Sequence, residues 1–71
     1  MNKFQVQILN GNKPDPEFKT VVTIHAVEAK DVRTIASSFY SEAACKYYFM
    51  EERSKVKVRI LSEDGTVTTL A

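Results

Sequence analysis

The sequence predicts a two-layer α+β fold in which one long helix packs on a mixed sheet of three to four strands. Three observations predict it: segments with strict apolar–polar alternation, one longer segment with apolar residues at steps of three and four, and their strand-strand-helix-strand-strand order. The 71 residues are 44% hydrophobic and 27% charged, a balance typical of folded globular proteins. We therefore expect a single domain over residues 1–71.

The first strand is predicted over Lys3–Leu9, because Phe4, Val6 and Ile8 alternate there with polar residues. Residues 10–17 follow as a loop, since an Asn-Gly pair and two prolines cannot continue a ladder of backbone hydrogen bonds.

The second strand is predicted over Phe18–His25, which also alternates. One face would carry Phe18, Thr20, Val22 and Ile24, and the other Lys19, Val21, Thr23 and His25.

A single long helix is predicted from Glu28 to Glu52. Its apolar stripe consists of Val32, Ile35, Ala36, Phe39, Tyr40, Ala43, Tyr47 and Met50. Acidic residues near its start suit the helix dipole. Two alternatives stay open: a break at the weak helix formers Ser37 and Ser38, and a non-helical segment over the strand-like residues 47–49.

Alternation returns over Lys55–Leu61, which predicts the third strand, and Ser62–Gly65 is a turn before a short fourth strand over Thr66–Leu70. The helical crossover is expected to place the third strand parallel to the first. Two sheet orders remain open, 2-1-3-4 and the β-grasp order 2-1-4-3.

Composition excludes several classes of function. A net charge of +1 excludes both a polybasic nucleic-acid arm and an acidic mimic of DNA. One cysteine, Cys45, cannot form an internal disulfide or supply a thiolate metal cage, and the single histidine, His25, is a thin supply for catalysis. Gly11 and Gly65 are too far apart to form a phosphate loop. We expect a protein that is not an enzyme and has no cofactor or metal.

The outward faces of the first three strands combine into a basic surface without acids. Its cations are Lys3, Lys19, Lys55, Lys57 and Arg59. Such a face can dock an acidic protein surface, or bind nucleic acid, although no aromatic ring is expected on it for base stacking. A solvated face that discourages edge pairing is the third alternative.

Tyr48 and Phe49 form a second candidate surface, because consecutive helical residues cannot all face the core. Exposed aromatic residues are typical interface anchors, and a homodimer through this region is open beside a monomer. The chain has no apolar run of about 18 residues to span a bilayer and no signal peptide, so we expect a cytoplasmic protein without membrane contact.

The segment Val21–Val32 is a strand that runs through a short alanine-containing link into an acid-started helix, a layout common among small phage-encoded proteins. The arrangement Lys3–Leu61 resembles, in pattern and length, the strand-strand-helix-strand layout of phage inhibitors of host RNA polymerase and of phage antitoxins that block host RNase toxins. This chain departs from that group by adding residues 62–71. The resemblance implies a non-enzymatic phage or mobile-element protein that binds and blocks a host enzyme or defence complex, and it assigns no role to any single residue.

Overall fold

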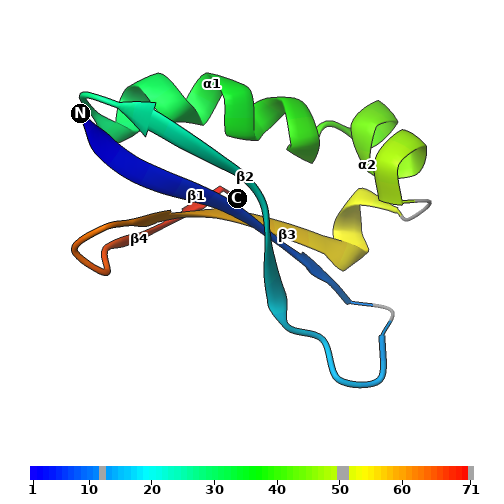
Figure 1. Cartoon of the computed structure of the whole chain (residues 1–71). Coiled ribbons are helices and arrows are strands. Elements are labelled where there is room, and N and C mark those ends of the chain that lie inside the picture. Colours follow the sequence, from blue (N-terminus) through cyan, green and yellow to red (C-terminus); the bar gives the residue numbers. More distant parts are fainter. Residues whose placement is uncertain (12, 50–51, 71) are drawn as a thin grey trace.

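A four-stranded antiparallel sheet and two short helices make up this small α+β fold. The computed structural model describes residues 1–11, 13–49 and 52–70, apart from the side chains of residues 42, 48 and 49. Its elements are β1 (Asn2–Asn10), β2 (Phe18–Ala26), α1 (Ala29–Tyr40), α2 (Glu42–Phe49), the 3-10 helix η1 (Arg53–Lys55), β3 (Val56–Ser62) and β4 (Val67–Leu70). Figure 1 shows α1 lying across one face of the sheet. The predicted strands agree with these bounds to within one residue at each end.

The strand order is β2-β1-β3-β4, which confirms one of the two orders that the sequence left open. The predicted mixed sheet is wrong, because every neighbouring pair is antiparallel. The helices return the chain along the sheet, so β3 runs in the direction of β2, the strand that precedes them. Since β1 is antiparallel to β2, it is antiparallel to β3 as well.

The hydrophobic core lies between α1 and the sheet. Its buried members are Phe4, Val6 and Ile8 on β1, Val56, Val58 and Ile60 on β3, Leu70 on β4, Val32 and Ala36 on α1, and Cys45 on α2. The alternation predicted for the first and third strands is therefore confirmed. Each large side chain buried here contributes about 1.5–3 kcal/mol of transfer free energy.

The predicted single helix is wrong, because the chain breaks at Ser41 and not at Ser37 or Ser38. Ser41 has extended backbone angles (φ −63°, ψ 151°) and caps the second helix: its Oγ accepts a hydrogen bond from the Ala44 N–H at 3.1 Å. The Ser41 carbonyl accepts another from the Cys45 N–H at 2.9 Å. An N-cap serine satisfies backbone donors that a new helix start leaves free.

The break redirects the apolar stripe that the sequence predicted. Cys45 is buried on α2, whereas Ala43 and Tyr47 are exposed, and Ile35 on α1 is also exposed. Residues 47–49 are helical, so the alternative hypothesis of a non-helical segment there is wrong.

The two glycines serve different needs. Gly65 has φ +89° in the β3–β4 turn, where its N–H donates to the Ser62 carbonyl at 3.0 Å. Gly11 lies against η1: its N–H donates to the Lys55 carbonyl at 2.7 Å, and an added Cβ would lie 2.7 Å from that oxygen. Gly11 is thus required by a close backbone approach, and Gly65 by a left-handed backbone.

Candidate functional site

The face of the sheet that points away from α1, here called the outer face, is the candidate functional site. Cross-strand pairing places on it Lys3, Gln5, Gln7 and Leu9 from β1, Phe18, Thr20, Thr23 and His25 from β2, Lys57, Arg59 and Leu61 from β3, and Val67 and Thr69 from β4. None of these residues of the described strands is acidic. Neither of the described α-helices covers this face (Figure 1).

A β-bulge at Val21 decides which residues of β2 reach the outer face. Val6 pairs with Val22, but the next residue, Gln7, pairs with Thr20, so Val21 has no partner on β1. The extra residue reverses the alternation from there on. The predicted faces of the second strand are therefore wrong over Phe18–Val21 and correct beyond it.

The bulge brings Phe18 and Thr20 to the outer face and takes Lys19 to the other side, where it pairs with the buried Ile8. The expectation that no aromatic ring lies on the outer face is thus wrong. The adjacent pair Val21-Val22 was the signal in the sequence, because two neighbouring apolar residues interrupt an alternating strand.

Of the five predicted cations, the structure brings Lys3, Lys57 and Arg59 together on the outer face. Lys19 lies on the opposite side, as described above. Lys55 belongs to η1 and lies outside the strands. Three of the five predicted cations therefore lie on the outer face, and Lys19 and Lys55 do not.

Arg59 is the most constrained of the three cations. Its Nε donates to Gln7 Oε1 at 2.8 Å, and its guanidinium carbon lies 3.8 Å from the centre of the Phe18 ring. Gln7 Nε2 in turn donates to Thr20 Oγ1 at 3.3 Å, and the Thr20 hydroxyl donates to Gln5 Oε1 at 2.9 Å. A continuous polar network therefore crosses β2, β1 and β3.

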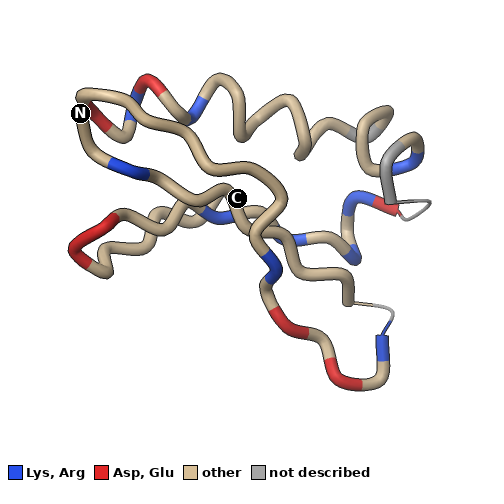
Figure 2. Tube along the Cα trace, in the orientation of Figure 1, with Lys and Arg blue, Asp and Glu red and all other residues tan. Residues whose placement is uncertain are grey.

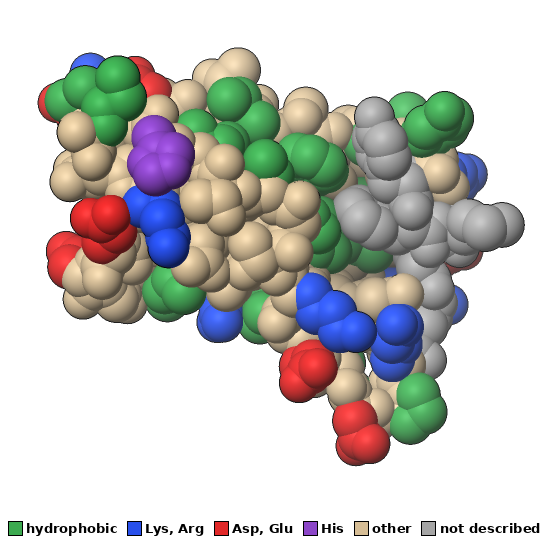
Figure 3. Space-filling view, in the orientation of Figure 1, with side chains coloured by type: hydrophobic (Ala, Val, Ile, Leu, Met, Phe, Trp, Pro, Cys, Tyr) green, Lys and Arg blue, Asp and Glu red, His purple; other side chains and the backbone are tan. Residues whose placement is uncertain are grey.

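Acidic residues lie in the connections at both ends of the strands. Asp15 and Glu17 lie in the loop between β1 and β2, and Glu63 and Asp64 in the turn between β3 and β4 (Figure 2). Figure 3 shows acidic side chains gathered at these two places on the surface. The cations thus form a patch of limited length between two acidic ends.

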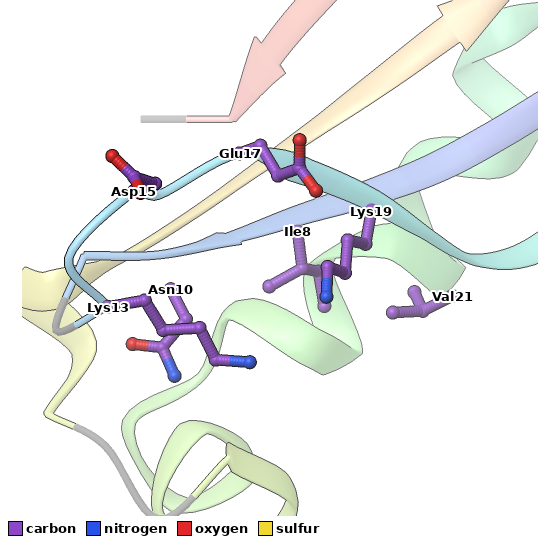
Figure 4. A pocket seen from close by; sticks show the side chains of 7 residues that line it. All are labelled: Ile8, Asn10, Lys13, Asp15, Glu17, Lys19 and Val21. Carbon is purple, nitrogen blue, oxygen red and sulfur yellow. The ribbon is translucent and has the colours of Figure 1, made fainter.

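A cavity of about 220 Å³ lies beside the β1–β2 loop. Its lining consists of Ile8, Asn10, Lys13, Asp15, Glu17, Lys19 and Val21. Figure 4 shows that Ile8 and Lys19 point to the same side of the two strands, as their pairing requires. This cavity lies on the helix side of the sheet and is separate from the outer face.

Cys45 and His25, the one cysteine and the one histidine of the chain, lie in different environments. Cys45 is fully buried, its Sγ donates to the Phe39 carbonyl at 3.5 Å, and burial raises the pKa of its thiol despite the nearby Arg53. His25 is exposed and pairs across the strands with Lys3 (Figure 3). Within the described residues, no three of His, Cys, Asp and Glu gather into a possible metal site.

The second candidate surface, Tyr48 and Phe49, lies outside the described side chains. Its neighbour Tyr47 is exposed on α2. Near this helix, the Arg53 guanidinium lies 4.5 Å from the centre of the Tyr40 ring.

Neither described helix is long and apolar enough to cross a membrane. No protein-family model, no curated protein and no solved structure matches the chain.

Proposed function

We propose that this chain is a non-catalytic binding module that docks its outer face on an acidic protein surface. One observation carries the proposal: Lys3, Lys57 and Arg59 share a sheet face that neither described α-helix covers and that has no acid among its described residues. Opposite charge on a partner raises the association rate and selects the partner. In line with the phage resemblance, the module acts by occlusion, blocking a host enzyme or defence complex in the cytoplasm.

The apolar residues of the outer face support protein docking. Leu9, Phe18 and Leu61 are each partly exposed there, and Val67 on the edge strand is exposed. Protein interfaces combine aromatic and arginine side chains near the centre with polar residues around them. The Phe18–Arg59 pair gives the outer face this combination.

Nucleic acid is the second candidate partner, and Phe18 is the observation that favours it. An aromatic ring beside cations on a sheet is the usual platform for base stacking. However, Arg59 already stacks on this ring. This contact and the apolar residues of the outer face favour a protein partner.

The test is an affinity pull-down from bacterial lysate, with and without nuclease treatment and at two salt concentrations, analysed by mass spectrometry. The parent chain is compared with a variant that carries Lys3→Glu and Lys57→Glu. The matched control carries Arg33→Glu and Lys46→Glu, which make the same charge change at exposed helical positions.

We expect a stoichiometric protein that the parent and the helix control retain and that the outer-face variant loses. Retention of this protein by the outer-face variant would contradict the proposal. Recovery of material that disappears on nuclease treatment would contradict it too and would favour nucleic acid.

A further inference from the structure

Two contacts fix the plane of the Arg59 guanidinium. The Phe18 ring packs against one flat side of the guanidinium, with 3.8 Å between the ring centre and the guanidinium carbon. Gln7 Oε1 accepts a hydrogen bond from the Arg59 Nε–H at 2.8 Å. Arginine normally loses considerable rotamer entropy when it binds a ligand. Here the side chain is half-buried and already ordered, so less of this cost remains for binding.

Gln7 is itself oriented by its neighbours. Its side chain is 9% exposed, and its Nε2 donates to Thr20 Oγ1, which leaves Oε1 to face Arg59. The Thr20 hydroxyl is held in turn by Gln5 Oε1. The network therefore fixes both the position of the acceptor and the direction of the guanidinium.

The two Nη groups of Arg59 remain available. Within the described part of the chain they have no hydrogen-bond partner, and the one ion pair there joins Lys30 to Glu28 on the helix side. Among the described residues, no side-chain nitrogen or oxygen is both buried and without a hydrogen-bond partner. Since the Nη atoms of Arg59 have no such partner, they are not buried and reach solvent. They present two parallel N–H donors, the geometry that a carboxylate accepts with both of its oxygens.

We propose that Arg59 anchors the partner by receiving one of its carboxylates on the Nη edge, with Phe18 and Gln7 as positioning residues. Lys57, the preceding outward residue on β3, meets a neighbouring acid as a point charge. The ligand is thus an acidic protein segment with at least two carboxylates. This inference rests on the proposed function and adds the residue on which binding depends.

The experiment is an NMR titration with a hexaglutamate peptide at low salt, which follows the backbone amides and the arginine Nε resonances. Arg59→Lys keeps the charge but removes the two-pronged donor and the ring contact. Arg33→Lys makes the same change at an exposed position on α1. Phe18→Leu removes the supporting ring, and Phe18→Tyr restores it.

We expect the Arg59 Nε resonance to move and Arg59→Lys to bind about tenfold more weakly, as loss of charge-assisted hydrogen bonds implies. Phe18→Leu should lower the affinity for the peptide about threefold. Phe18→Tyr and Arg33→Lys should bind the peptide as tightly as the parent. Outer-face amides that shift while Arg59→Lys binds like the parent would overturn the anchor but leave the proposed function standing. No shift on the outer face would overturn both.

Discussion

The guanidinium carbon of Arg59 lies 3.8 Å from the centre of the Phe18 ring, although the two residues belong to strands that are not neighbours in the sheet. The contact reaches from β3 to β2 across β1, where Gln7 accepts the Arg59 Nε–H. It exists because the bulge at Val21 turns Phe18 outward. Without this bulge, the alternation set by Val22 and Ile24 would turn Phe18 to the helix side.

Because of the bulge, β2 should tolerate deletion of Val21. Removing Val21 leaves Val22 paired with Val6 and Thr20 paired with Gln7, so each remaining side chain keeps its face. We expect this variant to stay folded and to keep the ring-shifted Arg59 Nε resonance in its NMR spectrum. The control deletion of Lys57, a regularly paired residue of β3 where no bulge can absorb the change, should lower the Tm strongly, because it forces the buried Val56 off the core.

If the two deletions lower the Tm equally, Val21 is not the extra residue of the strand. A lost ring shift in the Val21 deletion would contradict the assignment of faces in β2.

Alanine at the two glycines should destabilise the chain for different reasons. Gly11→Ala puts a Cβ 2.7 Å from the Lys55 carbonyl oxygen and disrupts the hydrogen bond there, with an expected loss of about 2–3 kcal/mol. Gly65→Ala meets open space, so only its backbone strain counts, about 1 kcal/mol. Urea denaturation measures both free energies of unfolding.

Asparagine distinguishes the two causes, because it tolerates a left-handed backbone but still has a Cβ. Gly65→Asn should be close to the parent in stability, and Gly11→Asn should resemble Gly11→Ala. A Gly11→Asn variant as stable as the parent would contradict the close approach of Gly11 to η1.

Cys45 should resist thiol reagents while the chain is folded. The side chain is buried, and burial raises the pKa of the thiol, so little thiolate forms at neutral pH. We expect iodoacetamide labelling, followed by mass spectrometry, to be slow in buffer and rapid in denaturant. Equally rapid labelling in both would show that α2 does not hold Cys45 in the core.

The stabilisation from Asp64 should depend on pH. Hydrogen bonds from the Thr66 backbone N–H and hydroxyl lower the pKa of the Asp64 carboxyl in the folded state. The stabilisation is therefore complete above the pKa of the unfolded chain and is lost as the pH falls through the lower folded value. We expect the Tm difference between the parent and Asp64→Ala to be larger at pH about 6 than at pH about 2. A difference that grows toward low pH would contradict this sign.

The sequence predicted the strands well because their alternation is a local property. Phe4, Val6 and Ile8 lie on one buried face, and so do Val56, Val58 and Ile60, as expected. The helix break at Ser41 was missed because apolar spacing continues past it, and only the Ser41 cap to Ala44 shows where the second helix starts. The predicted direction of the third strand was wrong because the helical crossover connects it to the second strand and not to the first. The third strand is therefore parallel to β2, which is not its neighbour, and antiparallel to β1.

The candidate site was predictable only in part. Alternation alone placed Lys3, Lys57 and Arg59 on one face, as the structure has them. The positions of Lys19 and Phe18 on opposite faces from those predicted depend on the pairing register between β1 and β2, which cannot be read from the composition of β2. The contact between Arg59 and Phe18 could not be predicted from either strand alone, because it depends on two pairings of β1.

Lysine footprinting tests most directly whether the outer face is the binding surface. Lys3 and Lys57 are exposed on that face, and Lys30 and Lys46 are exposed on the helices, so one acetylation experiment reports on both sides of the chain. The protein is acetylated free and in complex with the partner captured in the pull-down, and mass spectrometry measures modification at each lysine. We expect the partner to protect Lys3 and Lys57 and to leave Lys30 and Lys46 as reactive as before. Protection of Lys30 and Lys46 with Lys3 and Lys57 unchanged would contradict it.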